Sequence, residues 1–240
     1  MAFLFALFNC QAQRLSIGAK LAYNNTALYN KNIFDQVDYV KTHANSFGAQ
    51  LNLMFTKKWG ITADLLLANQ NQKYTLVDAT NTFNGEAEFT YLDIPFLLKR
   101  KNRIGLHFEV GPMISRLLSA KETVLNSDGS LNYSDKDFKK DFNDFGISAV
   151  GGLGWDIKIS RKIMISIEGR AGYMFTDVTT DYSNLSKEDL LIKLLTEQIS
   201  LNTYSSNINE NGDVSYAKSS RIFTGVNVGL HWVIVPFGLK

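Results

Sequence analysis

The fold is indicated most clearly by the stretch Phe145-Gly-Ile-Ser-Ala-Val-Gly-Gly-Leu-Gly-Trp-Asp-Ile-Lys-Ile159. The odd and even positions of this stretch differ in chemistry. The odd positions carry Phe, Ile, Ala, Gly, Leu, Trp, Ile and Ile, none of which is charged. The even positions carry Gly, Ser, Val, Gly, Gly, Asp and Lys. Successive side chains of a β-strand point to opposite faces, so this period of two predicts a long strand with one apolar face.

The same alternation recurs along the chain and predicts an all-β protein. The predicted strands cover residues 14–25, 45–57, 60–76, 86–100, 103–119, 143–160, 162–178 and 219–236. Each is long enough to cross a bilayer as a tilted strand, which takes about 9–11 residues. The links at 57–60, 101–102 and 160–162 are short, whereas those at 26–44, 77–85, 120–142 and 179–218 are long. This alternation is typical of an up-and-down outer-membrane barrel with periplasmic turns and long extracellular loops.

The two faces of these strands have opposite character. The central positions of the apolar face carry no charge in any of the eight runs, and aromatic residues lie near its ends: Tyr23, Phe55, Trp155, Tyr173, Phe175 and Trp232. The other face holds Lys20, Asp64, Asp93, Glu109, Asp156, Lys158, Glu168 and Arg170, with His107 and His231. It also holds ten glycines: Gly18, Gly48, Gly105, Gly111, Gly146, Gly152, Gly154, Gly172, Gly225 and Gly229.

A lipid-facing Arg or Lys at mid-bilayer costs about 2–4 kcal/mol, so we expect the charge-free face to contact lipid. The alternative is a soluble barrel such as a lipocalin, which has its apolar face inside. The aromatic residues at the ends of the apolar face favour the membrane interpretation, because outer-membrane barrels carry aromatic girdles at both interfaces.

The N-terminus resembles a secretory leader. The apolar run at 2–8 is too short to span a bilayer, and cleavage after Ala12 would give a signal peptide over residues 1–12. No basic residue precedes the run, so the leader looks truncated. Lipidation of Cys10 is the alternative, although Asn9 is large for the position before a lipidated cysteine. Residues 14–240 would then form one barrel domain without cysteine, hence without a disulfide or a cysteine-based metal site.

Three local features predict further structure. Unpaired edges are costly in lipid, so the first strand should pair with the last. Pro95 and Pro112 lie inside strands and predict a bulge or a local irregularity there. Ser186, Asp189 and the leucines that follow predict a short amphipathic helix at about 187–200, which would either pack over the rim or bind a partner.

Several motifs carry a family resemblance. The run Tyr91-Leu-Asp-Ile-Pro-Phe-Leu-Leu-Lys99, the later Phe108-Glu-Val-Gly-Pro112 and the Gly-rich 151–154 resemble PorT-like outer-membrane β-barrel proteins of the Bacteroidetes group, as does the leader ending Gln11-Ala-Gln13. The resemblance implies an outer-membrane barrel and makes both prolines family features. One namesake belongs to a secretion and gliding apparatus, a role that a shared barrel does not transfer.

The inward charges predict a filled lumen. An eight-stranded barrel is just wide enough for its side chains, so its interior ions should pair. Three inward cations and five carboxylates leave a local balance of −2. We expect a structural ion-pair network; the alternative is a narrow proton or cation path.

No catalytic, cofactor or metal site is expected. The histidines face inward without a matching lipid-facing serine, His43 alone is a weak metal signal, and the glycines at 151–154 lie inside a strand rather than before a helix. The net charge of +2 gives no argument for a nucleic-acid partner.

The sequence therefore predicts a non-enzymatic barrel of the bacterial outer membrane with a structural or interaction role through its extracellular loops. Its partners would be outer-membrane lipid or lipopolysaccharide and another envelope protein bound through loop 179–218. A passive small-solute or ion channel is the second hypothesis, and a lipid-modifying outer-membrane enzyme is the third.

Overall fold

The computed structural model describes residues 14–30, 37–40, 42–77, 82–125, 128–180 and 219–235. Among these residues, no helix has the length and apolar character needed to cross a membrane. The predicted signal peptide at 1–12, the predicted helix at 187–200 and nearly all of loop 179–218 lie outside the described residues.

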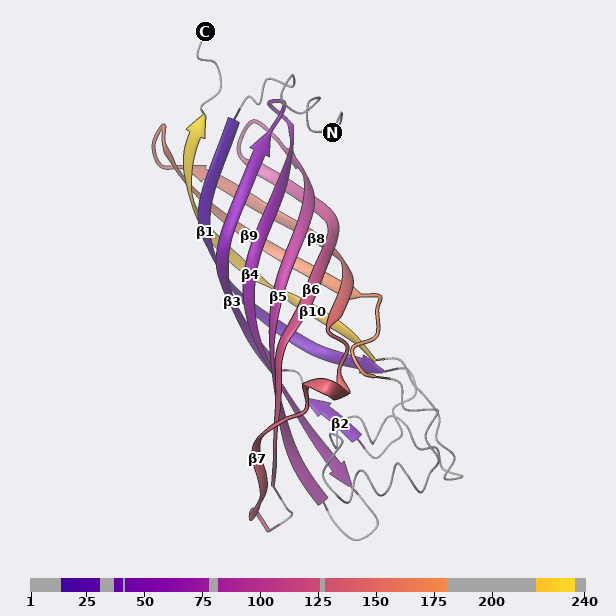
Figure 1. Ribbon diagram of the computed structural model, residues 1–240. Helices are drawn as coiled ribbons and strands as arrows, with labels where there is room; N and C mark the ends of the chain where they lie inside the picture. Colours follow the sequence, from indigo (N-terminus) through magenta and orange to yellow (C-terminus); the bar gives the residue numbers. More distant parts are fainter. Residues whose placement is uncertain are drawn as a thin grey trace.

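Eight long antiparallel strands form the barrel wall (Figure 1). They are β1 (Arg14–Asn30), β3 (Thr42–Met54), β4 (Trp59–Val77), β5 (Thr82–Lys101), β6 (Leu106–Leu125), β8 (Phe145–Lys158), β9 (Ile163–Met174) and β10 (Ser219–Val235). The predicted fold class and the eight strands are confirmed, although β1, β5 and β6 extend several residues further toward the long loops than predicted.

The barrel closes between its first and last strands, as predicted. β1 pairs with β10 from Leu15–Val235 to Asn30–Ser219, and its other edge pairs with β3. Short turns at 55–58, 102–105 and 159–162 join strands at the end where β1 begins and β10 ends. We call this the short-turn end, and the opposite end the long-loop end.

Three short elements at the long-loop end were not predicted. β2 (Val37–Val40) pairs with β4, β7 (Leu131–Asp137) pairs with β6, and a 3-10 turn, η1 (Lys139–Asp141), precedes β8. Figure 1 shows β2, β7 and the ends of β4, β5 and β6 projecting past the barrel as an arm. Strand alternation alone gave no signal for these segments, because each is short and is held by the extension of a neighbouring strand.

The two faces of the wall are those that the alternation predicts. Each residue assigned to the apolar face is exposed or half-buried, with Leu21 65% and Leu153 68% exposed. The polar side chains of the inward face are buried apart from Lys158 at the end of β8, with Lys20 at 1% and Glu109 at 0%. A soluble barrel would show the reverse arrangement, so the lipocalin alternative is wrong and the wall is built for lipid.

Aromatic residues mark both ends of this lipid-facing wall. Trp59, Trp155 and Trp232 lie toward the short-turn end, whereas Tyr23 and Tyr173 lie toward the long-loop end. All five are exposed. These two belts agree with the girdles expected at the membrane interfaces.

The prolines interrupt the ladder without shifting it. Pairing between β5 and β6 passes from Pro95–Met113 to Leu98–Val110 in one register, with no pair at the two positions between. The predicted irregularity is therefore present, but not as a bulge; the register shift between these strands lies at Thr90/Tyr91. Because proline cannot donate a ladder hydrogen bond, a local gap in pairing is the expected result.

Candidate functional site

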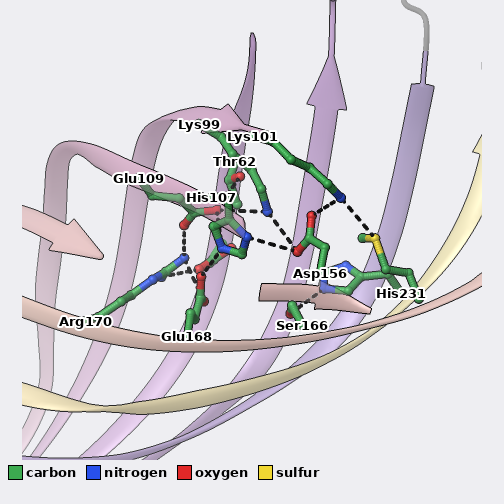
Figure 2. Close-up of polar contacts among 12 residues, drawn as sticks. Thr62, Lys99, Lys101, His107, Glu109, Asp156, Ser166, Glu168, Arg170 and His231 are labelled. Carbon is green, nitrogen blue, oxygen red and sulfur yellow. Dashed lines mark hydrogen bonds and ion pairs between the residues drawn. The ribbon is translucent and has the colours of Figure 1, made fainter. Parts of the chain in front are cut away.

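The half of the bore nearer the short-turn end is filled by a connected group of ionic side chains (Figure 2). We call it the ionic cluster: Lys20, Asp64, Lys99, Lys101, His107, Glu109, Asp156, Glu168 and Arg170. Its members come from β1, β4, β5, β6, β8 and β9, and each lies on the inward face of its strand.

Arg170 is the centre of the ionic cluster. Its Nη1 donates to Asp64 Oδ2 at 2.6 Å, and its Nη2 lies 2.8 Å from Glu109 Oε2 and 3.1 Å from Glu168 Oε1. Lys20 adds a second cation, with its Nζ 3.0 Å from Asp64 Oδ2 and in contact with Glu168. Charge-assisted pairs of this kind are the strongest hydrogen bonds available to buried side chains.

A second set of contacts surrounds Asp156. Its carboxylate accepts from Lys99 Nζ at 3.2 Å and from Lys101 Nζ at 2.5 Å. Lys99 also reaches Glu109 Oε1 at 3.2 Å, so it links the two sets. The His107 ring lies between them, with Nδ1 3.3 Å from Asp156 and Nε2 3.5 Å from Glu168.

A separate ion pair lies nearer the long-loop end. Arg221 binds Asp93 through both terminal nitrogens at 3.1 Å, and its guanidinium lies 4.5 Å from the centre of the Tyr91 ring. The guanidinium also lies 5.6 Å from the Phe223 ring. Within the described residues, no ion pair joins this bidentate pair to the ionic cluster.

Two corrections to the predicted network follow. Lys158, the last residue of β8, is exposed at the short-turn end rather than buried in the bore. Lys99, Lys101 and Arg221 were missed, although the first two share the strand face of Asp93 and Arg221 shares that of His231. Among the described residues, the ion pairs inside the barrel therefore join five cations to five carboxylates, whereas the predicted network had an excess of two negative charges.

Inward glycines leave the space that the long ionic side chains occupy. A Cβ added at Gly154 would lie 2.6 Å from both His107 Nε2 and the Glu168 Cβ. One added at Gly152 would lie 3.0 Å from Arg170 Cγ. In a barrel of this width, small residues beside large ones are what allow the interior to pack.

The half of the bore nearer the long-loop end is closed by apolar side chains. We call this group the apolar plug: Leu28, Ala68, Ala87, Phe89, Tyr91, Leu117, Ala120, Phe138, Phe142, Met174 and Val178. Phe138 and Phe142 flank η1, so the connection before β8 turns inward and covers the bore. The Phe142 ring meets Phe89 edge to face at 4.9 Å between centroids.

Ser166 and His231 form a hydroxyl–imidazole contact within the bore. Ser166 Oγ lies 2.8 Å from His231 Nε2, which is the spacing of a nucleophile and a base. His231 Nδ1 has no hydrogen-bond partner among the described residues, so the orienting third group is missing. Both side chains are also buried, with His231 only 1% exposed.

One trio of residues has the geometry for a metal ion. Ligand atoms of His107, Glu109 and Glu168 lie within 4.8 Å of one another. Lys99 and Arg170 already contact these carboxylates, and their positive charge opposes a divalent cation at the same place. His43 lies on the outer face of β3 against Tyr23, away from this trio.

Comparison with known proteins places the chain in a family. The family model described as "Outer membrane protein beta-barrel domain" matches residues 11–180. No curated protein matches the sequence.

Solved outer-membrane barrels resemble the chain at low identity. Ail of Yersinia pestis, in complex with the heparin analogue sucrose octasulfate, is 8% identical, with 90% of this chain and 98% of that chain covered and a TM-score of 0.39. OprG of Pseudomonas aeruginosa is 11% identical, with 93% of this chain and 96% of that chain covered and a TM-score of 0.42. The translocator domain of NalP from Neisseria meningitidis is 10% identical, with 96% and 93% covered and a TM-score of 0.40.

These TM-scores are too low to carry an argument, so the assignment depends on the family match and on the lipid-facing wall. The matched residues include seven of the eight barrel strands in full, together with the ionic cluster and the apolar plug. The chain belongs to the outer membrane protein beta-barrel domain family, and it lies in the bacterial outer membrane.

Proposed function

We propose that this barrel is a closed, non-enzymatic anchor that holds its extracellular segments at the cell surface for binding. The observation that supports the proposal is the filling of the bore. The half nearer the short-turn end holds the neutral ionic cluster, and the half nearer the long-loop end holds the apolar plug. A pore needs a continuous polar path, and an enzyme needs an accessible reacting group. The paired ions and the apolar plug favour a closed bore, and the burial of Ser166 and His231 favours a non-enzymatic one.

The long-loop end supplies the surface for such a role. β4, β5 and β6 continue past the barrel and carry β2 and β7 as added strands (Figure 1). Near the tip of this arm, Leu125 and Leu131 are exposed. A projecting sheet on a rigid barrel is a suitable carrier for a binding surface, because loops on rigid scaffolds carry recognition in many folds.

We also propose that the chain belongs to the PorT-like branch of the barrel family. The Tyr91–Lys99 and Phe108–Pro112 motifs support this, and the structure gives them a shared packing role. A Cβ at Gly111 would lie 2.1 Å from the Phe96 carbonyl oxygen, so glycine permits the close approach of β5 and β6 beside the two prolines. This role is structural and implies no activity.

Surface cross-linking on intact cells tests the binding role. Cells producing the full chain would be compared with cells in which residues 181–218 are replaced by a short Gly-Ser linker. A second variant would shorten the β6–β7 tip at 126–130. We expect each variant to reach the outer membrane and to lose specific cross-links to envelope components. An unchanged cross-linking pattern in both variants would contradict the proposal.

Liposome swelling tests the closed bore with the same preparations. Vesicles containing the purified protein should not swell in isotonic solutions of small sugars or amino acids. Swelling at a rate that falls with solute size would instead support the passive channel hypothesis.

A further inference from the structure

The short-turn end carries exposed charge of one sign. We call its exposed cations the basic rim: Lys57, Lys58, Arg100, Arg103, Lys158, Arg161 and Lys162. The exposed carboxylates of the described residues are Glu88, Asp128, Asp135, Asp137 and Asp144, and all of them belong to the long-loop end. No exposed carboxylate in the described part of the chain therefore compensates the basic rim.

A groove connects this rim to the lipid-facing wall. It has a volume of about 960 Å³, and its part at the short-turn end is lined by Lys58, Arg100 and Arg103. Further from that end, it follows the outer surface of β6, β8 and β9. There it is lined by the exposed side chains Leu106, Phe108, Leu153, Trp155 and Ile167. We call it the rim groove. It has a cationic end and an apolar end, in the order that an amphiphile at the interface requires.

Aromatic side chains mark where the rim groove meets the interface. Trp155 Nε1 donates to the Ile104 carbonyl at 2.8 Å, which holds the ring beside the β5–β6 turn. The Arg100 guanidinium lies 5.4 Å from the centre of the Trp59 ring. Tryptophan is enriched at the headgroup level of membranes, so the cations of the basic rim lie at the depth of lipid phosphates.

Two outward glycines extend the apolar end. Gly169 pairs with Leu153, and Gly151 precedes Leu153 by one outward position. A Cβ at Gly151 would meet no atom within 4 Å, and one at Gly169 would meet only the Leu153 carbonyl oxygen at 4.0 Å. Interior crowding, which explains Gly154, does not explain these two residues. Their effect is a strip of wall beside Leu153 without projecting side chains.

We propose that the rim groove binds an anionic glycerophospholipid of the inner leaflet, with its phosphate between Lys58, Arg100 and Arg103 and an acyl chain along the wall. The assignment to the inner leaflet follows from the periplasmic position of short turns in these barrels. Charge complementarity favours a lipid with net negative charge, such as phosphatidylglycerol, over a zwitterionic one. The bound lipid would fix the depth of the barrel at its periplasmic interface.

Native mass spectrometry of the purified full chain tests this selection directly. The protein would be equilibrated in detergent with equal amounts of phosphatidylglycerol and phosphatidylcholine. The wild type should retain phosphatidylglycerol at least about tenfold better, since each interfacial Lys or Arg changes anionic-lipid binding about fivefold. Equal retention of the two lipids would overturn the proposal without any variant.

A charge-matched pair of variants locates the site. The variant Lys58→Gln/Arg100→Gln/Arg103→Gln should lose the preference for phosphatidylglycerol. The control Arg116→Gln/Lys121→Gln/Lys140→Gln removes the same charge from exposed residues of the long-loop end and should keep it. A heat-modifiability gel checks that both variants fold. Loss of the preference in the control as well would mean that net charge, and not the rim groove, selects the lipid.

Fluorescence quenching tests the acyl-chain part. In a Trp59→Phe/Trp232→Phe background, Trp155 is the remaining tryptophan, and phosphatidylglycerol with brominated chains should quench it more than brominated phosphatidylcholine. Equal quenching by the two lipids would contradict the placement. Displacement of the lipid by inorganic phosphate at the same concentration would also overturn the proposal, because the rim would then bind phosphate alone. None of these readouts depends on the cross-linking that tests the anchor role.

Discussion

The two halves of the bore are closed by opposite chemistry. In the ionic cluster, Arg170 contacts Asp64, Glu109 and Glu168, and all of the cluster's side chains are ionisable. In the apolar plug, Phe89, Phe138 and Phe142 are each buried without any charge among the plug residues. The first closure depends on pairing of buried charges and the second on the exclusion of water.

The ionic cluster and the apolar plug have different weaknesses as closures of the same barrel. An ion-paired interior resists water poorly if one partner is lost, because an unpaired buried charge draws water toward it. An apolar plug lacks that weakness but needs side chains from outside the wall, here from the segment around η1. The two closures should therefore respond differently to single substitutions.

The largest effect is expected in the ionic cluster. Arg170→Ala leaves three carboxylates without their shared cation, and it should lower the free energy of unfolding by about 4 kcal/mol. Urea titration in detergent, followed by tryptophan fluorescence, measures this loss. Arg116→Ala, at an exposed arginine that lies over Phe145, should cost no more than about 1 kcal/mol. Similar losses for the two variants would contradict the central role of Arg170.

Truncation in the apolar plug should have a somewhat smaller effect. Phe89→Ala removes the edge-to-face contact with Phe142 and leaves a cavity, so we expect a loss of about 3 kcal/mol. The ionic cluster remains intact in this variant, and ion flux should stay at the level of the wild type. A Phe89→Leu control should recover most of the stability. Ion leakage through Phe89→Ala would show that the ionic cluster does not close the bore by itself.

Glycine substitutions compare the stability cost of an added methyl group on the inner and outer faces of β8. Gly154→Ala places a methyl group against His107 and Glu168 and should cost about 1–3 kcal/mol. Gly151→Ala, three residues earlier on the outer face, meets no atom within 4 Å and should change stability by less than about 1 kcal/mol. The shift in the urea midpoint gives both values. Equal shifts would mean that the interior of the barrel is not crowded at Gly154.

The smallest effect tests the correction at the end of β8. Lys158 is exposed, so Lys158→Gln should change the unfolding free energy by less than about 0.5 kcal/mol. Lys99→Gln, which removes a buried contact to both Glu109 and Asp156, is the matched comparison and should cost several times more. A large loss of unfolding free energy for Lys158→Gln would show that Lys158 belongs to the buried ion-pair network after all.

Strand parity predicted the wall well, because a period of two fixes the face of each residue once the strand is known. The apolar exterior followed from the same pattern, and the closure of β1 on β10 followed from the cost of unpaired edges in lipid. Parity does not fix depth, which depends on strand tilt and stagger. Lys158 and Asp156 share a face, yet only Asp156 lies within the bore.

The alternation of side chains along the strands could not predict the apolar plug. Phe138 and Phe142 lie between two predicted strands, in a segment whose conformation depends on β7 and η1 packing against the wall. Lys99 and Arg221 were accessible by parity but were not identified, and with Lys101 they supply the charges that balance the interior.

Single-channel recording in a planar bilayer tests the closed bore most directly. With the folded wild type inserted at high salt, we predict a steady baseline under applied voltage, because the proposed closure by the ionic cluster and the apolar plug would leave no continuous water path. Phe89→Ala/Arg170→Ala, with both closures weakened, provides the positive control if it folds in the same bilayer. Stable, unitary current steps from the wild type would contradict a closed barrel.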